Sequence, residues 1–193
     1  MERISVRKLA RVLWVMAIVV LACNIIVLFF VPGLALMRSE LGMLGELTPY
    51  ENPLELPARL LSVFTLCWSP EYWALAEDPY AAVLMVFLLS CGVCTAIILW
   101  QGKRVLDTIL KGDPFVLDNA KSLKRAAVCC FLISGAALAR LIWGFVYYQS
   151  ILPLLTYNAL FVPIFLMGGL LFMVMSALFR QAAQMKAEND LTI

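Results

Sequence analysis

The chain has 193 residues, of which 63% are hydrophobic and only 15% are charged, with a formal net charge of +2 and a mean hydropathy of +0.91. Soluble domains carry about 45–50% apolar and about 25% charged residues, so this composition excludes an ordinary soluble protein. Histidine is absent, which excludes imidazole acid–base catalysis and histidine metal sites.

Four stretches are long and apolar enough to cross a bilayer, which takes about 20 consecutive, mostly apolar residues. Each must be helical, because hydrocarbon offers no partner for free backbone N–H and C=O groups. We therefore predict an all-α integral membrane protein, with residues 1–193 forming a single four-helix domain. The predicted spans are about residues 12–31, 80–100, 126–148 and 154–179.

Charge predicts the orientation. Twelve Lys and Arg residues lie before the first span, between the second and third spans, or after the fourth, whereas the other side has two Arg residues against seven acids. Because cationic loops stay in the cytoplasm, we expect both termini inside, in a multi-pass protein of the bacterial inner membrane. The predicted extramembrane parts are an outer loop over 32–79, which is either a lid or a sensor, a cytoplasmic hairpin over 101–125 and a cytoplasmic tail over 180–193.

The segment "ILKGDPFVLDNAKSLKR" predicts that this hairpin is helical. Gly112 is a typical helix stop, and Asp113 followed by Pro114 is a typical helix start, with a side-chain cap and a preset backbone angle. Phe115 beside this turn either packs back on the helices or docks a partner. The tail "FRQAAQMKAENDLTI" should extend the fourth helix, with Glu188 and Asp190 marking its end, because acids oppose the dipole at a helix C-terminus.

Small residues mark where the later helices approach one another, since lipid provides no hydrophobic drive for their association. We expect packing contacts at Gly92 in the second span, at Ser134 and Gly135 in the third, and at Gly168 and Gly169 in the fourth.

The hairpin and the tail together resemble a bacterial membrane family described as domain of unknown function 2975. There a Gly-x-Pro-Phe turn precedes an Asn and then a Leu, and similar residues end the chain. The resemblance implies that some members partner small Cro-type helix-turn-helix regulators. The positions it marks for partner binding are Gly112, Pro114, Phe115, Asn119, Leu123, Glu188, Asn189, Asp190, Leu191 and Thr192.

The leading hypothesis is thus a non-enzymatic membrane partner of a small cytoplasmic DNA-binding regulator, acting as anchor, inhibitor or sensor. The expected partners are the lipid bilayer and this regulator, with no direct nucleic-acid contact and no cofactor or metal. Homo-oligomerisation stays open.

Arg140 is the single ionisable residue within a predicted span, and such residues usually face the bundle interior or a wet cavity. One hypothesis is a ligand pocket for an anion or signal molecule, or the site of a small-solute carrier; the other is a structural pin between helices. The polar residues expected at a similar depth are Asn24, Ser90, Tyr157 and Asn158.

Cys91 and Cys94 have the spacing of a redox pair, so a four-helix thiol-disulfide oxidoreductase is an alternative function. The pair lies near the membrane centre, where apolar surroundings disfavour a reactive thiolate. Inert small side chains are therefore the favoured interpretation.

Overall fold

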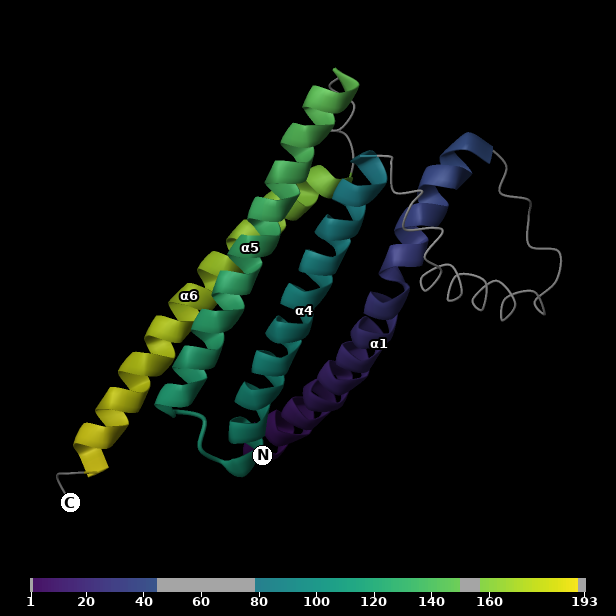
Figure 1. The fold of residues 1–193 in the computed structure, drawn as a ribbon. Coiled ribbons are helices and arrows are strands. Elements are labelled where there is room, and N and C mark those ends of the chain that lie inside the picture. Colours follow the sequence, from purple (N-terminus) through teal and green to yellow (C-terminus); the bar gives the residue numbers. More distant parts are fainter. Residues whose placement is uncertain (1, 45–78, 150–156, 191–193) are drawn as a thin grey trace, which may run out of the picture.

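The structure, a computed structural model, describes residues 2–44, 79–149 and 157–190. It consists of four long helices: α1 (Glu2–Leu44), α4 (Pro79–Lys111), α5 (Leu117–Tyr148) and α6 (Tyr157–Asp190). The main packing contacts join α1 to α4, α4 to α5, and α5 to α6 (Figure 1). The predicted outer loop beyond Leu44 lies outside the described residues.

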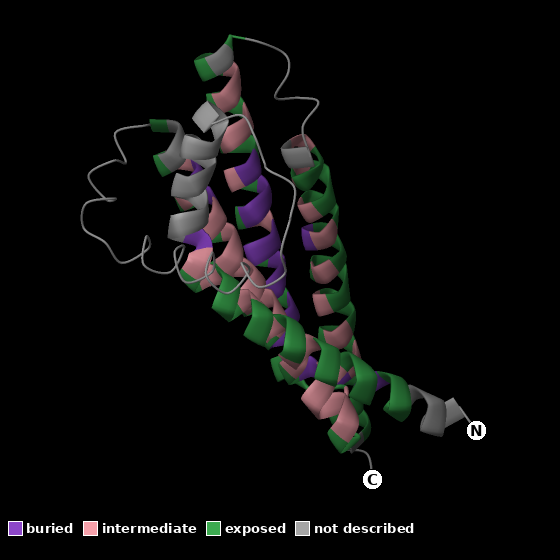
Figure 2. Cartoon of the chain, turned by 90° about the vertical axis from the view of Figure 1, so that its right-hand side faces the viewer, coloured by how far each residue is buried: buried purple, intermediate pink, exposed green. Residues whose placement is uncertain are grey.

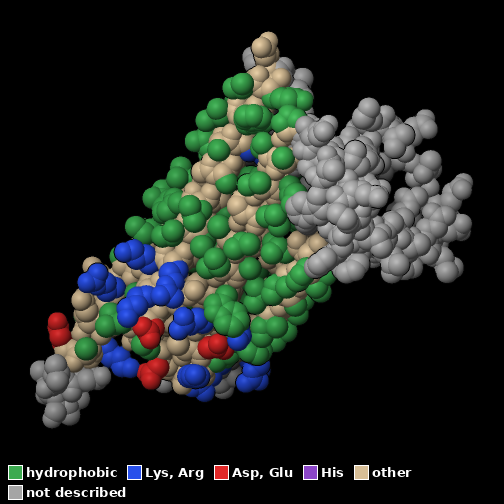
Figure 3. Space-filling model, in the orientation of Figure 1, with side chains coloured by type: hydrophobic (Ala, Val, Ile, Leu, Met, Phe, Trp, Pro, Cys, Tyr) green, Lys and Arg blue, Asp and Glu red, His purple; other side chains and the backbone are tan. Residues whose placement is uncertain are grey.

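The predicted all-α class and the four membrane-spanning helices are confirmed. Each helix contains a segment long and apolar enough to cross a bilayer. The start of α1, the connection between α4 and α5, and the end of α6 lie at the same end of the molecule (Figure 1). We call this the basic end, because Lys and Arg gather there on the face drawn in Figure 3. That the basic end faces the cytoplasm stays a prediction.

The helices are longer than a bilayer requires. α1 continues as a helix to Leu44, beyond the predicted limit of its span at residue 31. α6 extends to Asp190, as we expected from the acids near its end. At the basic end the helices extend beyond the predicted spans, so residues outside the hydrocarbon region also make contacts from one helix to another.

α5 is the central helix of the bundle. Over the 18 most apolar consecutive residues of α5, 39% are buried, whereas at most 11% are buried over the corresponding stretch of each other helix. Figure 2 shows the buried positions gathering along the middle of the molecule. Ala127 and Ala137 are fully enclosed and Ile133 nearly so. Small side chains on α5 thus allow neighbouring helices to approach it closely.

α5 and α6 are joined by two hydrogen bonds and one tight glycine contact. The Ser134 hydroxyl donates to the Val162 carbonyl oxygen at 2.9 Å, and the Ser176 hydroxyl donates to the Ala120 carbonyl oxygen at 2.7 Å. Between them, Gly169 faces the ring of Phe131, so closely that an added Cβ would lie 2.8 Å from a ring carbon. The prediction that Ser134 and Gly169 are packing residues is therefore confirmed.

The other three glycines that we expected at helix contacts differ in their surroundings. Gly92 on α4 lies against the side chain of Leu28 on α1, where a Cβ would clash. Gly135 and Gly168, by contrast, have open space where a Cβ would stand, with nothing within 4 Å. The expectation that these two glycines pack between helices was wrong within the described chain. The neighbouring residues, Ser134 and Gly169, make the contacts instead.

The two adjacent glycines of α6 provide a matched test. Gly169→Ala should lower the free energy of unfolding by about 1–3 kcal/mol, because the new methyl group overlaps the Phe131 ring. Gly168→Ala should be neutral or slightly stabilising, because its methyl group enters open space and alanine favours the helix. Thermal denaturation of the two purified variants in one detergent measures the difference. Equal stability of the two would contradict the described α5–α6 packing.

Candidate functional site

The connection between α4 and α5 is a tight turn at the basic end. Gly112 ends α4 with φ of +93°, a left-handed conformation that residues with a Cβ rarely adopt. The amide of Gly112 donates to the Ile109 carbonyl oxygen, and the amide of Asp113 donates to the Thr108 carbonyl oxygen at 3.1 Å. The predicted glycine stop is confirmed, because these bonds occupy carbonyl groups left free at the end of α4.

The start of α5 differs from our expectation. The helix begins at Leu117 after Val116, which is extended and provides no side-chain cap, and not at Asp113 and Pro114. The Asp113 carboxylate accepts a hydrogen bond from the Lys186 ammonium of α6 at 2.7 Å instead of capping a helix. The predicted helix start was wrong: the Asp113 amide belongs to the turn that ends α4, and its carboxylate faces Lys186 of α6.

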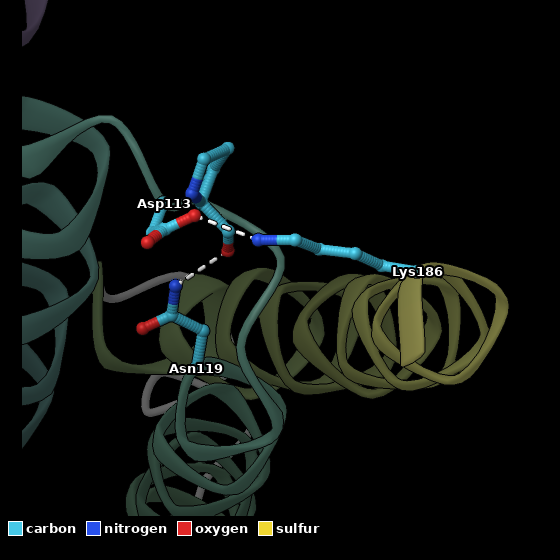
Figure 4. Close-up of polar contacts among 4 residues, drawn as sticks. Asp113, Asn119 and Lys186 are labelled. Atoms are coloured by element: carbon cyan, nitrogen blue, oxygen red, sulfur yellow. Dashed lines mark hydrogen bonds and ion pairs between the residues drawn. The ribbon is translucent and has the colours of Figure 1, made fainter. Parts of the chain in front are cut away.

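Asn119 fixes the shape of the turn. The residue is 2% exposed, and its Nδ2 donates to the Thr108 hydroxyl at 2.6 Å. The same Nδ2 donates to the Pro114 carbonyl oxygen at 2.7 Å (Figure 4). One amide group thus connects the last turn of α4, the bend and the first turn of α5. Buried polar groups are costly when unpaired, so these bonds hold the bend in one conformation.

The turn also rests on α6. The Phe115 ring lies 5.9 Å from the Phe179 ring, centroid to centroid, in a tilted arrangement. The Lys186–Asp113 ion pair lies farther out, where both partners are exposed and the contribution to stability is about 0–1 kcal/mol. We infer that aromatic packing and the Asn119 bonds position the hairpin, with the ion pair secondary.

The predicted partner-binding positions separate into internal and exposed ones. Asn119 and Leu123 are buried, and Gly112 and Pro114 serve the turn itself. Phe115, Glu188 and Asn189 are exposed. The side chain of Asp190 and residues 191–192 lie outside the described part of the chain.

The sequence analysis missed two exposed apolar neighbours of Phe115. Val116 and Leu117 are exposed like Phe115, so three consecutive apolar side chains face outward at the basic end. We call these three residues the hairpin patch. The letters "FVL" between polar residues were the available indication, but only the placement of the helices around the turn shows that all three side chains are accessible.

A second polar cluster at the basic end joins α1 to α4. The Trp14 indole N–H donates to Asp107 Oδ1 at 2.6 Å, and the Lys103 ammonium lies 3.9 Å from Asp107 Oδ2. The same ammonium lies over the rings of Trp14, at 5.8 Å, and Trp100, at 5.2 Å. The sequence analysis missed this cluster, although Lys103 and Asp107 have the i,i+4 spacing of a helical ion pair.

Arg140 lies over the Phe87 ring of α4, with its guanidinium carbon 4.8 Å from the ring centroid. Ser90, one turn along, donates its hydroxyl to the Phe87 carbonyl oxygen of its own helix. Asn24 lies on α1, which packs against α4, and its buried Oδ1 has no hydrogen-bond partner among the residues that the structure describes. The side chains of Tyr157 and Asn158 lie outside the described residues. The described geometry is that of a cation–π contact between α4 and α5.

The redox-like pair lies in the same interface. Cys91 and Cys94 on α4, and Cys129 and Cys130 on α5, are free cysteines, and the last two are buried. Across the described helices, no three potential ligands are arranged to hold a metal ion.

Asn119→Ala should lower the free energy of unfolding by about 1–3 kcal/mol, because it removes two buried hydrogen bonds and leaves the Pro114 carbonyl oxygen unpaired. Cleavage by trypsin at Lys111 and Lys121, which flank the turn, should become faster. Limited proteolysis of the purified protein measures the rate, with Lys186→Gln, which removes the exposed ion pair to Asp113, as the control. An unchanged rate in Asn119→Ala would contradict the role given to this side chain.

Comparison with known proteins supports the resemblance found in the sequence. The profile of the family described as "Protein of unknown function (DUF2975)" matches residues 43–193, which include α4, α5, α6 and the predicted outer loop from residue 43 onward. Searches of curated proteins and of solved structures find no significant match. Because the match covers well over half of the chain, the protein belongs to the DUF2975 family.

Proposed function

We propose that this protein is a non-enzymatic partner of a small cytoplasmic helix-turn-helix regulator, which docks on the hairpin patch at the basic end. The observation that carries the proposal is the exposure of three consecutive apolar residues: Phe115 is 47% exposed, Val116 36% and Leu117 49%. Contiguous apolar surface outside a membrane span is typical of protein interaction sites.

The patch is suited to docking because it is held in place. Asn119 fixes the bend on one side of it, and the Phe115–Phe179 contact fixes the other. A preorganised surface binds more tightly, since little conformational entropy is lost on association. The proposed site is therefore a rigid turn presented by the ends of three helices.

The charge around the patch indicates what kind of protein surface would fit. Lys121, Lys124 and Arg125 follow the patch on α5 and are exposed, and further cations surround the basic end (Figure 3). Opposite charge on a partner speeds its association and orients it. We therefore propose a partner with an apolar groove bordered by acidic residues, and a regulator held in this way would be kept at the inner membrane away from DNA.

Two further points complete the proposal. The positive-inside bias supports a cytoplasmic location for the basic end, where a regulator is accessible. The helix-turn-helix identity of the partner comes from the family resemblance of the turn and the tail. The proposed localisation is the bacterial inner membrane.

Replacing Val116 and Leu117 with serine should reduce co-purification of the regulator about tenfold or more, because residues at the centre of an interface carry most of its binding energy. This pair leaves the Phe115–Phe179 contact in place. The full-length protein is purified in mild detergent from its native host, and co-purifying DNA-binding proteins are quantified by mass spectrometry.

The matched control replaces Gln181 and Gln184 with serine. Both residues are exposed on α6, carry no charge and lie outside the hairpin patch and its surrounding cations. The control should retain the regulator. If no helix-turn-helix protein co-purifies, or if both double variants retain it equally, the proposed function is wrong.

A further inference from the structure

Three cations at the basic end lack a counter-charge in the described part of the chain. Lys124 and Arg125 of α5 and Arg180 of α6 are exposed and make no ion pair or hydrogen bond with the described residues. We call these three residues the cation group. Three acids at this end already have a cationic partner: Asp107, Asp113 and Asp118. Because like charges repel, a negative group from outside the chain would stabilise the cation group.

The packing of α5 on α6 brings cations of the two helices toward one level of the bundle. α5 and α6 run antiparallel (Figure 1). The Ser176 hydroxyl donates to the Ala120 carbonyl oxygen, and Arg180 and Lys124 follow these two residues by about one turn each. Helical side chains tilt toward the N-terminus of their own helix, so Lys124 and Arg180 tilt toward each other. Figure 3 shows Lys and Arg side chains gathered over the ends of α5 and α6 at the basic end.

The cation group lies at the boundary of the predicted hydrocarbon region. Lys124 and Arg125 directly precede the third predicted span, and Arg180 directly follows the fourth. Farther along α5, about one and two turns after Lys124, Val128 is 49% exposed and Leu132 is 59% exposed. Exposed apolar side chains within a span contact the acyl chains of the bilayer. The cations thus lie at the depth of lipid phosphates, beside an apolar surface at the depth of the chains.

This arrangement indicates a phospholipid of net negative charge. Basic sites between helices at the cytoplasmic side of a membrane protein typically bind the head groups of anionic lipids. An arginine guanidinium donates two N–H groups to one phosphate, and a lysine ammonium adds a compact positive charge. The cations repel the positive group of a zwitterionic lipid, which lowers its affinity. A soluble anion would contact the cations alone and leave Val128 and Leu132 without a role.

We propose that the cation group binds one anionic phospholipid. Its phosphate lies between Lys124, Arg125 and Arg180, and its acyl chain lies along Val128 and Leu132. The site does not include the hairpin patch and does not depend on the proposed regulator. A lipid bound to α5 and α6 together holds the basic ends of these two helices against each other.

The test is native mass spectrometry of the purified full-length protein, without any regulator, in mild detergent with equal amounts of dioleoylphosphatidylglycerol and dioleoylphosphatidylcholine. The Kd of the first phosphatidylglycerol should be lower than that of phosphatidylcholine by about tenfold or more, since each cation near a head group contributes about fivefold. In the triple variant Lys124→Gln, Arg125→Gln, Arg180→Gln, the two Kd values should be equal. The triple variant Lys124→Arg, Arg125→Lys, Arg180→Lys should keep the preference, because it keeps the charge.

The matched control is the triple variant Lys8→Gln, Arg11→Gln, Lys111→Gln. It removes the same charge from exposed cations of α1 and the end of α4, which also have no partner among the described residues, so it should keep the preference. An equal loss of preference in both glutamine variants would overturn the site, because the basic end would then attract anionic lipid only in general. Equal Kd values for the two lipids in the unmodified protein, or displacement of phosphatidylglycerol by excess glycerol phosphate, would overturn the ligand class.

Discussion

The two hydrogen bonds donated by Asn119 determine how the basic end of this protein is built. They connect the Thr108 hydroxyl in the last turn of α4 to the Pro114 carbonyl oxygen in the bend, from a side chain in the first turn of α5. Because α5 is the central helix, its direction relative to α4 sets where α6 lies. The contacts of the turn with α6, Phe115 on Phe179 and Asp113 with Lys186, require that same direction.

Polar groups in this bundle are used mainly to connect helices. The Ser134 and Ser176 hydroxyls join α5 and α6, and Trp14 joins α1 to Asp107 of α4. In hydrocarbon, where apolar side chains gain little by leaving lipid for one another, such bonds and close packing provide much of the specificity. The Gln101 oxygen departs from this pattern, since it is buried and unpaired. The hairpin patch is the reverse case, because its apolar side chains are exposed beside many cations.

The sequence predicted features that depend on one helix at a time. Span positions follow from local hydropathy, the end of α4 follows from the backbone freedom of Gly112, and the end of α6 follows from charge. Apart from the packing contacts at Ser134, Gly169 and Gly92, features that depend on two helices were missed or misplaced. Asp113 pairs with a residue 73 positions away instead of capping α5, and the Trp14–Asp107 bond spans 93 positions.

The same distinction applies to the candidate sites. The turn motif drew attention to the correct segment, but spacing could not show that Asn119 faces inward while Val116 and Leu117 face outward. Arg140 was correctly singled out as unusual, yet its position over Phe87 depends on the register between α4 and α5.

The central claim is that the turn held by Asn119 is presented to the cytoplasm. The most direct measurement is labelling of Asp118→Cys, in a Cys67→Ser background, with a membrane-impermeant maleimide. Asp118 is exposed in the first turn of α5, next to Asn119. The account predicts labelling in inverted membrane vesicles and none in intact cells whose outer membrane has been made permeable. Labelling of Asp118→Cys in those intact cells would place the turn outside and contradict the account.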